Sequence, residues 1–270
     1  MGAAAVDSFT RYLEELERAR PGGERRPENL VVVRSVSSTN QLARDIVADY
    51  EREAQDLHPL LILAVEQRGG RGRHGRVWTS PAGKGVYATR VLSTRDPELL
   101  QTLPMLVGLG LCHALTPHLP VPCRLKWPND LVVETPEGRR KIGGILIEAL
   151  IHPGEGAAAI IGFGVNHSHA PEDLPESGTS VRLLGGAGDL VDLTWDLVLA
   201  VERELKHLND FGYAVAAYRE LSVHQPGDAI SCRIGAEVVE GMFLGFDDRG
   251  RLRLQRGSEE ILVASGEVIE

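Results

Sequence analysis

Apolar residues recur along the chain at helical spacing in some segments and as short continuous or alternating runs in others. The helical spacing predicts amphipathic helices, one of which begins at a polar Ser-Ser-Thr-Asn cluster that is able to cap it. The helices are expected over residues 8–19, 40–50, 97–115 and 192–211, followed by a short helix ending at 221.

The apolar runs predict strands over residues 30–33, 60–65, 87–92, 124–127, 131–133, 142–150 and 157–165. Short Gly, Pro and Asn turns join the last four, which favours a mixed or antiparallel sheet over a doubly wound parallel one. After residue 225 the chain changes to four short alternating segments, a pattern typical of a small β-barrel. The sequence therefore predicts an α+β protein with one part over 1–222, including a helical extension over 1–29, and a second part over 223–270.

Composition narrows the classes of protein. The formal net charge is −9 over 270 residues, so a broad basic face for nucleic acid is not expected. No apolar run reaches about 18 residues, and the N-terminus lacks the features of an export signal. The three cysteines show no C-x-x-C spacing, which argues against a disulfide framework and a zinc site. A reducing, cytoplasmic setting without a membrane partner is expected.

One segment departs from this acidic background. Between Arg68 and Lys84 the chain holds four Arg, one Lys and five Gly with no acidic residue, directly after a predicted strand. Glycines allow a close approach of the backbone, and Arg forks bind phosphate oxygens in pairs. The segment is therefore predicted to hold an anion, with a nucleotide as the first candidate.

Other functions for this loop are less consistent with its surroundings. Its Gly-x-Gly-x-x-Gly spacing matches a dinucleotide fingerprint, but the residues up to Pro81 cannot open the helix that this fingerprint needs. The P-loop spacing is absent. An RGG-type RNA segment and a plain solvated loop stay as alternatives; the first is usually repetitive, and the second leaves four Arg to repel one another.

Further polar residues follow other predicted strands. Lys126, Asn129 and Asp130 lie at the end of one, and Lys141 and Glu148 lie within the next strand pair, so that two cations could converge. Asn166 closes another strand. His167 and His169 follow it, but two alternate histidines without a third ligand do not make a metal site.

These motifs together resemble those of the biotin protein ligases. The resemblance covers about residues 30–270 and rests on an ordered series of motifs: Ser-Ser-Thr-Asn at 37–40, Glu-Gln at 66–67, Gly-Arg-Gly-Arg-His-Gly-Arg-Val-Trp at 70–78, Lys-Trp-Pro-Asn-Asp at 126–130, Lys-Ile-Gly-Gly-Ile-Leu-Ile-Glu at 141–148 and Gly-Phe-Gly-Val-Asn at 162–166. His74 departs from the pattern, since many relatives carry Arg there.

The resemblance implies a mixed sheet flanked by helices, similar to class II aminoacyl-tRNA synthetases, with a C-terminal SH3-like barrel. It implies that biotin and ATP form biotinyl-5′-adenylate with Mg²⁺, and that the biotinyl group passes to a lysine of a carboxyl carrier protein or domain of a biotin-dependent carboxylase. A homodimer is left open. The N-terminal 30 residues cannot supply a winged-helix domain, so DNA binding is not expected.

The resemblance also implies roles for individual residues. The catalytic residues are expected to be Lys126 and Arg73. Biotin contacts are expected from Ser38, Thr39, Asn40, Gln67, Gly70, Arg71, Gly72, Arg73, Lys126, Gly143 and Gly144. ATP contacts are expected from Arg71, Arg73, Arg76, Trp78, Asn129, Asp130, Lys141 and Asn166. Mg²⁺ is expected on the substrate phosphates, with Asp130 as its candidate protein ligand. A lipoate or octanoate ligase and a non-catalytic sensor are the alternatives.

Overall fold

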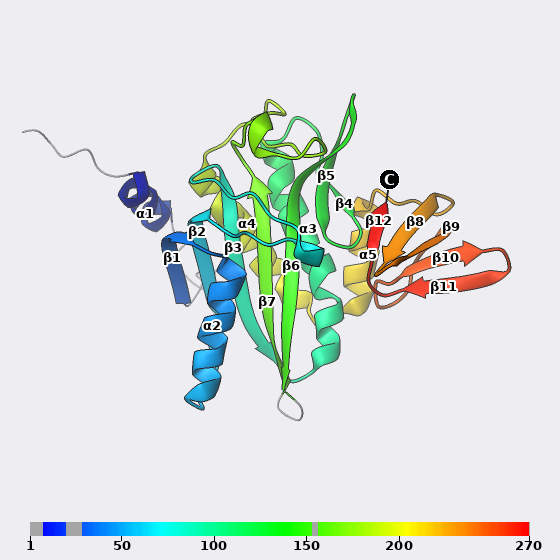
Figure 1. Cartoon of the computed structure of the whole chain (residues 1–270), viewed down its shortest axis with the longest axis horizontal. Helices are drawn as coiled ribbons and strands as arrows, with labels where there is room; N and C mark the ends of the chain where they lie inside the picture. The colour runs from blue at the N-terminus through cyan, green and yellow to red at the C-terminus, as the bar shows by residue number, and fades with distance from the viewer. Residues whose placement is uncertain (1–7, 20–28, 153–155, 270) are drawn as a thin grey trace, which may run out of the picture.

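The computed structural model describes residues 8–19, 29–152 and 156–269 (Figure 1). Its main element is a seven-stranded sheet in the order β1-β2-β3-β7-β6-β5-β4. Only β1 and β2 pair in parallel, so the sheet is mixed, as predicted. The strands are β1 (Asn29–Val36), β2 (Leu60–Gln67), β3 (Gly85–Thr94), β4 (Arg124–Lys126), β5 (Asp130–Thr135), β6 (Gly138–His152) and β7 (Gly156–Asn166).

Helices cover both faces of this sheet (Figure 1). On β2, Leu61 and Leu63 join the core under the helices of one face, whereas Leu60 and Ile62 join a second cluster with α2. This alternation follows from the two-residue period of a strand. The helices are α1 (Ser8–Ala19), α2 (Thr39–Arg52), α3 (Leu103–Leu115), α4 (Leu190–Glu204) and α5 (Phe211–Leu221).

Two predicted helices are divided in the structure. The segment 97–115 forms a 3₁₀ turn, Pro97–Gln101, and then α3, because Pro104 lacks an N–H and its ring obstructs a helix running through it. In the segment 192–211, the helix α4 ends at Glu204, and a 3₁₀ turn, Leu205–His207, follows it. Asp210 then caps α5 by accepting a hydrogen bond from the Tyr213 N–H at 2.9 Å. This cap starts a new helix at a place where the apolar spacing predicted that the previous helix would continue.

The C-terminal residues form a separate antiparallel sheet in the order β11-β10-β9-β8-β12. It has five strands rather than the predicted four, because a three-residue strand follows Gly266. They are β8 (Ala229–Ile234), β9 (Glu237–Phe246), β10 (Leu252–Arg256), β11 (Glu259–Val263) and β12 (Glu267–Ile269). A domain boundary at residue 223 stays a prediction.

The two sheets are joined by buried contacts. The Trp127 indole N–H donates to the Gly250 carbonyl at 3.1 Å, and Tyr218 of α5 packs edge-on against Phe246 with 5.4 Å between ring centroids. Trp127 immediately follows β4, so the second sheet lies beside the Lys126–Asp130 turn. Within the described ranges, no helix is long and apolar enough to cross a bilayer.

Candidate functional site

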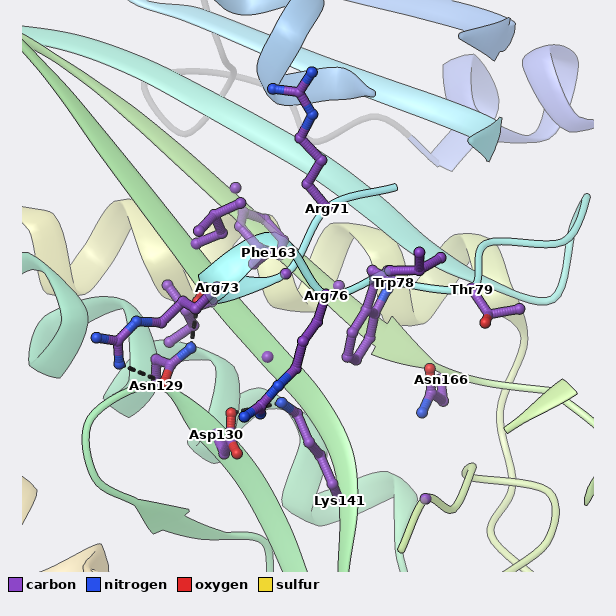
Figure 2. A pocket seen from close by; sticks show the side chains of 18 of the residues that line it. Arg71, Arg73, Arg76, Trp78, Thr79, Asn129, Asp130, Lys141, Phe163 and Asn166 are labelled. Carbon is purple, nitrogen blue, oxygen red and sulfur yellow. Dashed lines mark hydrogen bonds and ion pairs between the residues drawn. The ribbon is translucent and has the colours of Figure 1, made fainter. Parts of the chain in front are cut away.

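A cavity of about 400 Å³ opens on the face of the large sheet that α2 partly covers. Along β7, the side chains on this face change from Ala158 and Ile160, which pack in the cluster with α2, to Gly162 and Gly164, which line the cavity. The basic loop, residues 68–84, covers this part of the sheet instead of a helix (Figure 2). Glu267 and Val268 of β12 also line the cavity. The cavity therefore forms where glycines leave this face of β7 without side chains.

Most residues predicted for the site line this one cavity. They are Ser38, Thr39, Asn40, Gln67, Arg71, Gly72, Arg73, Arg76, Trp78, Lys126, Asn129, Asp130, Lys141, Gly144 and Asn166. Gly70 and Gly143 are not among its lining residues. A Cβ on Gly70 would lie 2.3 Å from the Trp78 carbonyl oxygen, and one on Gly143 would lie 2.9 Å from the Gly164 carbonyl oxygen. Both positions thus need glycine for packing of the backbone.

At one end of the cavity, neutral polar side chains hydrogen-bond one another. The Thr39 backbone N–H and hydroxyl both donate to the Gln67 side-chain oxygen, at 2.9 and 3.1 Å. The Gln67 amide nitrogen donates to the Ser80 hydroxyl at 2.9 Å, which fixes the orientation of its amide. Ser38 is the N-cap of α2, but its side chain makes no capping hydrogen bond. This end suits a neutral polar group.

The basic loop is a hairpin. Trp78 N–H donates to the Gly70 carbonyl at 2.9 Å, and Gly72 N–H donates to the Arg76 carbonyl at 2.8 Å. A single 3₁₀ turn, Arg73–Gly75, forms its tip, with positive φ at His74 and Gly75. No α-helix opens after the glycines, in agreement with the prediction from Pro81, so the dinucleotide fingerprint lacks its structural context.

The arginines of the loop point in different directions. Figure 2 shows the Arg71 side chain extending away from Asp130 and Lys141. Arg73 Nη1 donates to Asn129 Oδ1 at 3.3 Å and to the Gly266 carbonyl at 3.0 Å. Burial lowers the pKa of the Arg73 guanidinium from its usual value. Both residues line the cavity, but their guanidinium groups point to different parts of it.

Trp78 lies against the backbone of two neighbouring strands. A Cβ on Gly164 would lie 2.5 Å from the indole nitrogen, and one on Gly144 would lie 3.5 Å from the ring. Lys141 Nζ lies 5.5 Å from the ring centroid and 2.6 Å from Asp130 Oδ1. The indole N–H is buried and has no acceptor in the described part of the chain. An aromatic face, a lysine and an unused donor thus meet at one place.

The two histidines that follow β7 are buried, and one ring nitrogen of each lies within hydrogen-bond distance of a neutral group. His167 Nε2 is 3.2 Å from the Gly188 carbonyl, and His169 Nε2 is 3.2 Å from the Tyr87 hydroxyl. Burial lowers the pKa of each ring from its usual value. In the described ranges, no three His, Cys, Asp or Glu side chains gather as a metal site.

Sequence reasoning missed several lining residues. Gly162 and Gly164 carried a usable signal, because alternate glycines inside a strand indicate close approach of another group. Arg139 of β6 also lines the cavity, two residues before Lys141. Glu267 and Val268 come from the far end of the chain, where nothing in the local sequence indicates a site.

The chain is similar to known families and proteins. Residues 32–166 match the family model described as the biotin/lipoate A/B protein ligase family, and residues 229–269 match that of the biotin protein ligase C-terminal domain. The chain is 31% identical over 221 residues to a protein of Paracoccus denitrificans named a biotin acetyl-CoA-carboxylase ligase, covering 77% of this chain and 88% of that protein.

Other similarities extend over more of the chain. A protein of Mycobacterium tuberculosis with the same name is 29% identical over 248 residues, which cover 89% of this chain and 88% of that protein. The solved structure of a biotin protein ligase from Aquifex aeolicus, in complex with biotin and ATP, superimposes with a TM-score of 0.70 over 90% of this chain and 98% of that one. At 24% identity this last likeness shows the fold.

Proposed function

Since the chain belongs to the biotin/lipoate A/B protein ligase family, we propose that it activates biotin with ATP and transfers the biotinyl group to a lysine of a carrier protein. The observation that carries this proposal is that one cavity joins a neutral polar end, formed by Thr39 and Gln67, to a cationic end with Lys126 and Lys141. Such a cavity suits a neutral ring at one end and phosphates at the other.

In the first step, a carboxylate oxygen of biotin attacks the α-phosphorus of ATP, and the bond from this phosphorus to the bridging oxygen breaks to release pyrophosphate. Lys126 and Arg73 would offset the negative charge that gathers on the α-phosphate oxygens. The Trp78 ring and its indole N–H would orient the nucleotide. In this step the residues supply charge and position rather than a proton.

In the second step, the amine of the acceptor lysine attacks the acyl carbon of the mixed anhydride, and AMP leaves. Water would compete in this step, because the anhydride is an activated acyl group. Arg73, through Asn129 and the Gly266 carbonyl, would hold the basic loop over the adenylate and keep water out.

The donors at the cationic end are suited to Mg²⁺ carried by ATP. Mg²⁺ in nucleotide sites commonly takes one or two protein carboxylates together with phosphate oxygens and water. Asp130 supplies one carboxylate, of which Oδ1 bonds Lys141 at 2.6 Å. When bound, Mg²⁺ would neutralise charge on the phosphates, and Asp130 would orient it.

The experiment that tests this function is ATP–pyrophosphate isotope exchange with biotin, with lipoate and with neither. Exchange that requires biotin is the expected result. Exchange that requires lipoate would assign the chain to the other branch of the same family, and absence of exchange with either acid would favour a sensor. Transfer to a purified carrier domain would then test the second step.

A further inference from the structure

The side chain of Asn40 bridges two strands of the large sheet, β3 and β6, across β7, which lies between them. It is 4% exposed, and its oxygen accepts a hydrogen bond from the Thr89 hydroxyl at 2.7 Å. Its amide nitrogen donates to the Leu146 carbonyl at 3.2 Å and to Glu148 Oε2 at 3.0 Å. Because an amide has two donor hydrogens and two acceptor lone pairs, both donors of Asn40 are used and one lone pair is left.

The neighbours of Asn40 decide which way its amide points. The Leu146 carbonyl and the Glu148 carboxylate only accept hydrogen bonds, so turning the amide over would place oxygen against oxygen at two contacts. In the sheet, Gly162 lies between Thr89 and Leu146. A Cβ on Gly162 would lie 2.1 Å from Asn40 Oδ1. The oxygen therefore lies against the glycine backbone that forms part of the cavity floor.

Glu148 acts on this arrangement from outside the cavity. Asn40 lines the cavity, but Glu148 is not among the lining residues. The carboxylate of Glu148 also pairs with Arg44, one helical turn after Asn40 on α2. The ion pair keeps the carboxylate in the place where it can receive the Asn40 N–H. Glu148 is therefore linked to the cavity by its hydrogen bond with Asn40.

We propose that Glu148 is a positioning residue, which holds the Asn40 oxygen toward the cavity and so selects an acid whose ring carries N–H donors. The inference rests on the proposed function. The cyclic urea of biotin has two N–H groups, whereas the dithiolane ring of lipoate has none. Since the family model covers ligases for both acids, the Glu148–Asn40 pair contributes to the choice between them.

The test is a double-mutant cycle on biotin affinity, measured by calorimetry on the full-length chain. Glu148→Met keeps the length of the side chain but removes one of the two acceptors, so that the Leu146 carbonyl alone holds the orientation of the Asn40 amide. Biotin affinity is expected to fall about tenfold in the wild-type background and less than about twofold in the Asn40→Ala background. The apparent KM for ATP is expected to stay within about twofold, because the nucleotide does not contact Asn40 in the proposed arrangement.

Glu202→Met supplies the matched control. Glu202 is also a partly buried carboxylate paired with an arginine, Arg90, at the large sheet, but it does not contact Asn40. Its substitution is expected to leave biotin affinity unchanged. If thermal melting shows that Glu148→Met does not fold, Glu148→Gln takes its place in the cycle. The expected Asn40-dependent loss of biotin affinity is then about threefold, because glutamine keeps one acceptor but can also present its NH₂ to the Asn40 amide.

The inference is overturned if Glu148→Met weakens biotin equally in both backgrounds, or weakens ATP as much as biotin, since either result means a general structural role. Unchanged biotin affinity would overturn it as well. Failure of the proposed function looks different: the wild-type chain would then show no biotin-dependent exchange and no biotin binding before any substitution is made.

Discussion

Arg76 of the basic loop donates from its two terminal guanidinium nitrogens to the two carboxylate oxygens of Glu267 in β12, although 191 positions separate the residues. One of the two hydrogen bonds measures 2.6 Å. The bond to Arg76 lowers the pKa of the Glu267 carboxyl from its usual value. The last strand of the second sheet therefore gives the loop an anionic partner, which accepts paired hydrogen bonds from an arginine as a phosphate does.

Substitution of Glu267 should loosen the loop with little effect on the whole fold. Arg76 is 57% exposed and Glu267 30%, and pairs of this kind contribute about 0–1 kcal/mol. In Glu267→Gln, tryptic cleavage after Arg76 is expected to be about threefold faster, at nearly the same melting temperature. Glu260→Gln, which breaks an ion pair with Arg253 elsewhere in the same sheet, should leave this cleavage rate unchanged. Equal rates in all three proteins would show that the pair does not hold the loop.

Replacement of Arg73 should release the adenylate. Arg73→Gly removes the hydrogen bonds to Asn129 and Gly266, so the loop covers the intermediate less often. Biotin labelling of a bystander protein is expected to rise by about tenfold or more. Arg68→Gly, an exposed position of the same loop that does not line the cavity, serves as the control. Retention of the adenylate in Arg73→Gly would contradict a clamping role.

Lys126 should act on the rate of adenylate formation more than on biotin binding. Loss of one charge that stabilises a transition state commonly costs about 10²–10³ in rate. Lys126→Met is therefore expected to lower the rate of biotin-dependent exchange by about this factor, with biotin affinity changed much less. Lys206→Met, on an exposed turn outside the cavity, is the comparison. A loss confined to KM would assign Lys126 a binding role instead.

The glycine under Trp78 should be required for the nucleotide site. In Gly164→Ala the new Cβ would lie 2.5 Å from the indole nitrogen, so the ring must move. The KM for ATP is expected to rise about tenfold, as for a mispositioned binding group. In Gly212→Ala, by contrast, the nearest atom would be 3.5 Å away. The change in indole position can be followed by tryptophan fluorescence, with Trp78→Phe used to separate Trp78 from Trp127 and Trp195. An unaltered spectrum with normal ATP kinetics would disprove the packing argument.

Stability should fall in mild acid because of two buried histidines. Burial lowers the pKa of His167 and His169 below 6.5, so below this pH the unfolded chain binds more protons than the folded chain. The free energy of unfolding is fully retained above about pH 6.5 and decreases as the pH falls below it. Urea titrations at a series of pH values would measure the slope. His169→Gln should flatten it, whereas substitution of the exposed His58 should not.

Local chemistry made the basic loop and the Lys126–Asp130 turn predictable, because their residue types are unusual for an acidic chain. Most of the residues that the resemblance names for the site line one cavity, and their roles there stay predictions. Helix boundaries were harder. The apolar spacing runs on through Pro104 and past Asp210, where a missing N–H and a capping side chain end or restart helices.

Contacts between distant parts of the chain could not be predicted from the local sequence pattern. Glu267 reaches the site because the second sheet docks beside β4, through contacts that include those of Trp127 and Tyr218. Likewise, the fixed amide of Asn40 depends on Thr89 and Glu148 from two other strands. Neither relationship has a local signature, since each forms only when the sheets assemble.

The glycine floor of the cavity also bears on inhibition. A compound that rests on the backbone at Gly162 and Gly164 would meet main-chain atoms, which a substitution cannot exchange for others. A bulkier residue at Gly162 would collide with Asn40, and one at Gly164 with Trp78. Resistance through added bulk at either position would thus impair the site itself, so this floor is a durable target for a competitive ligand.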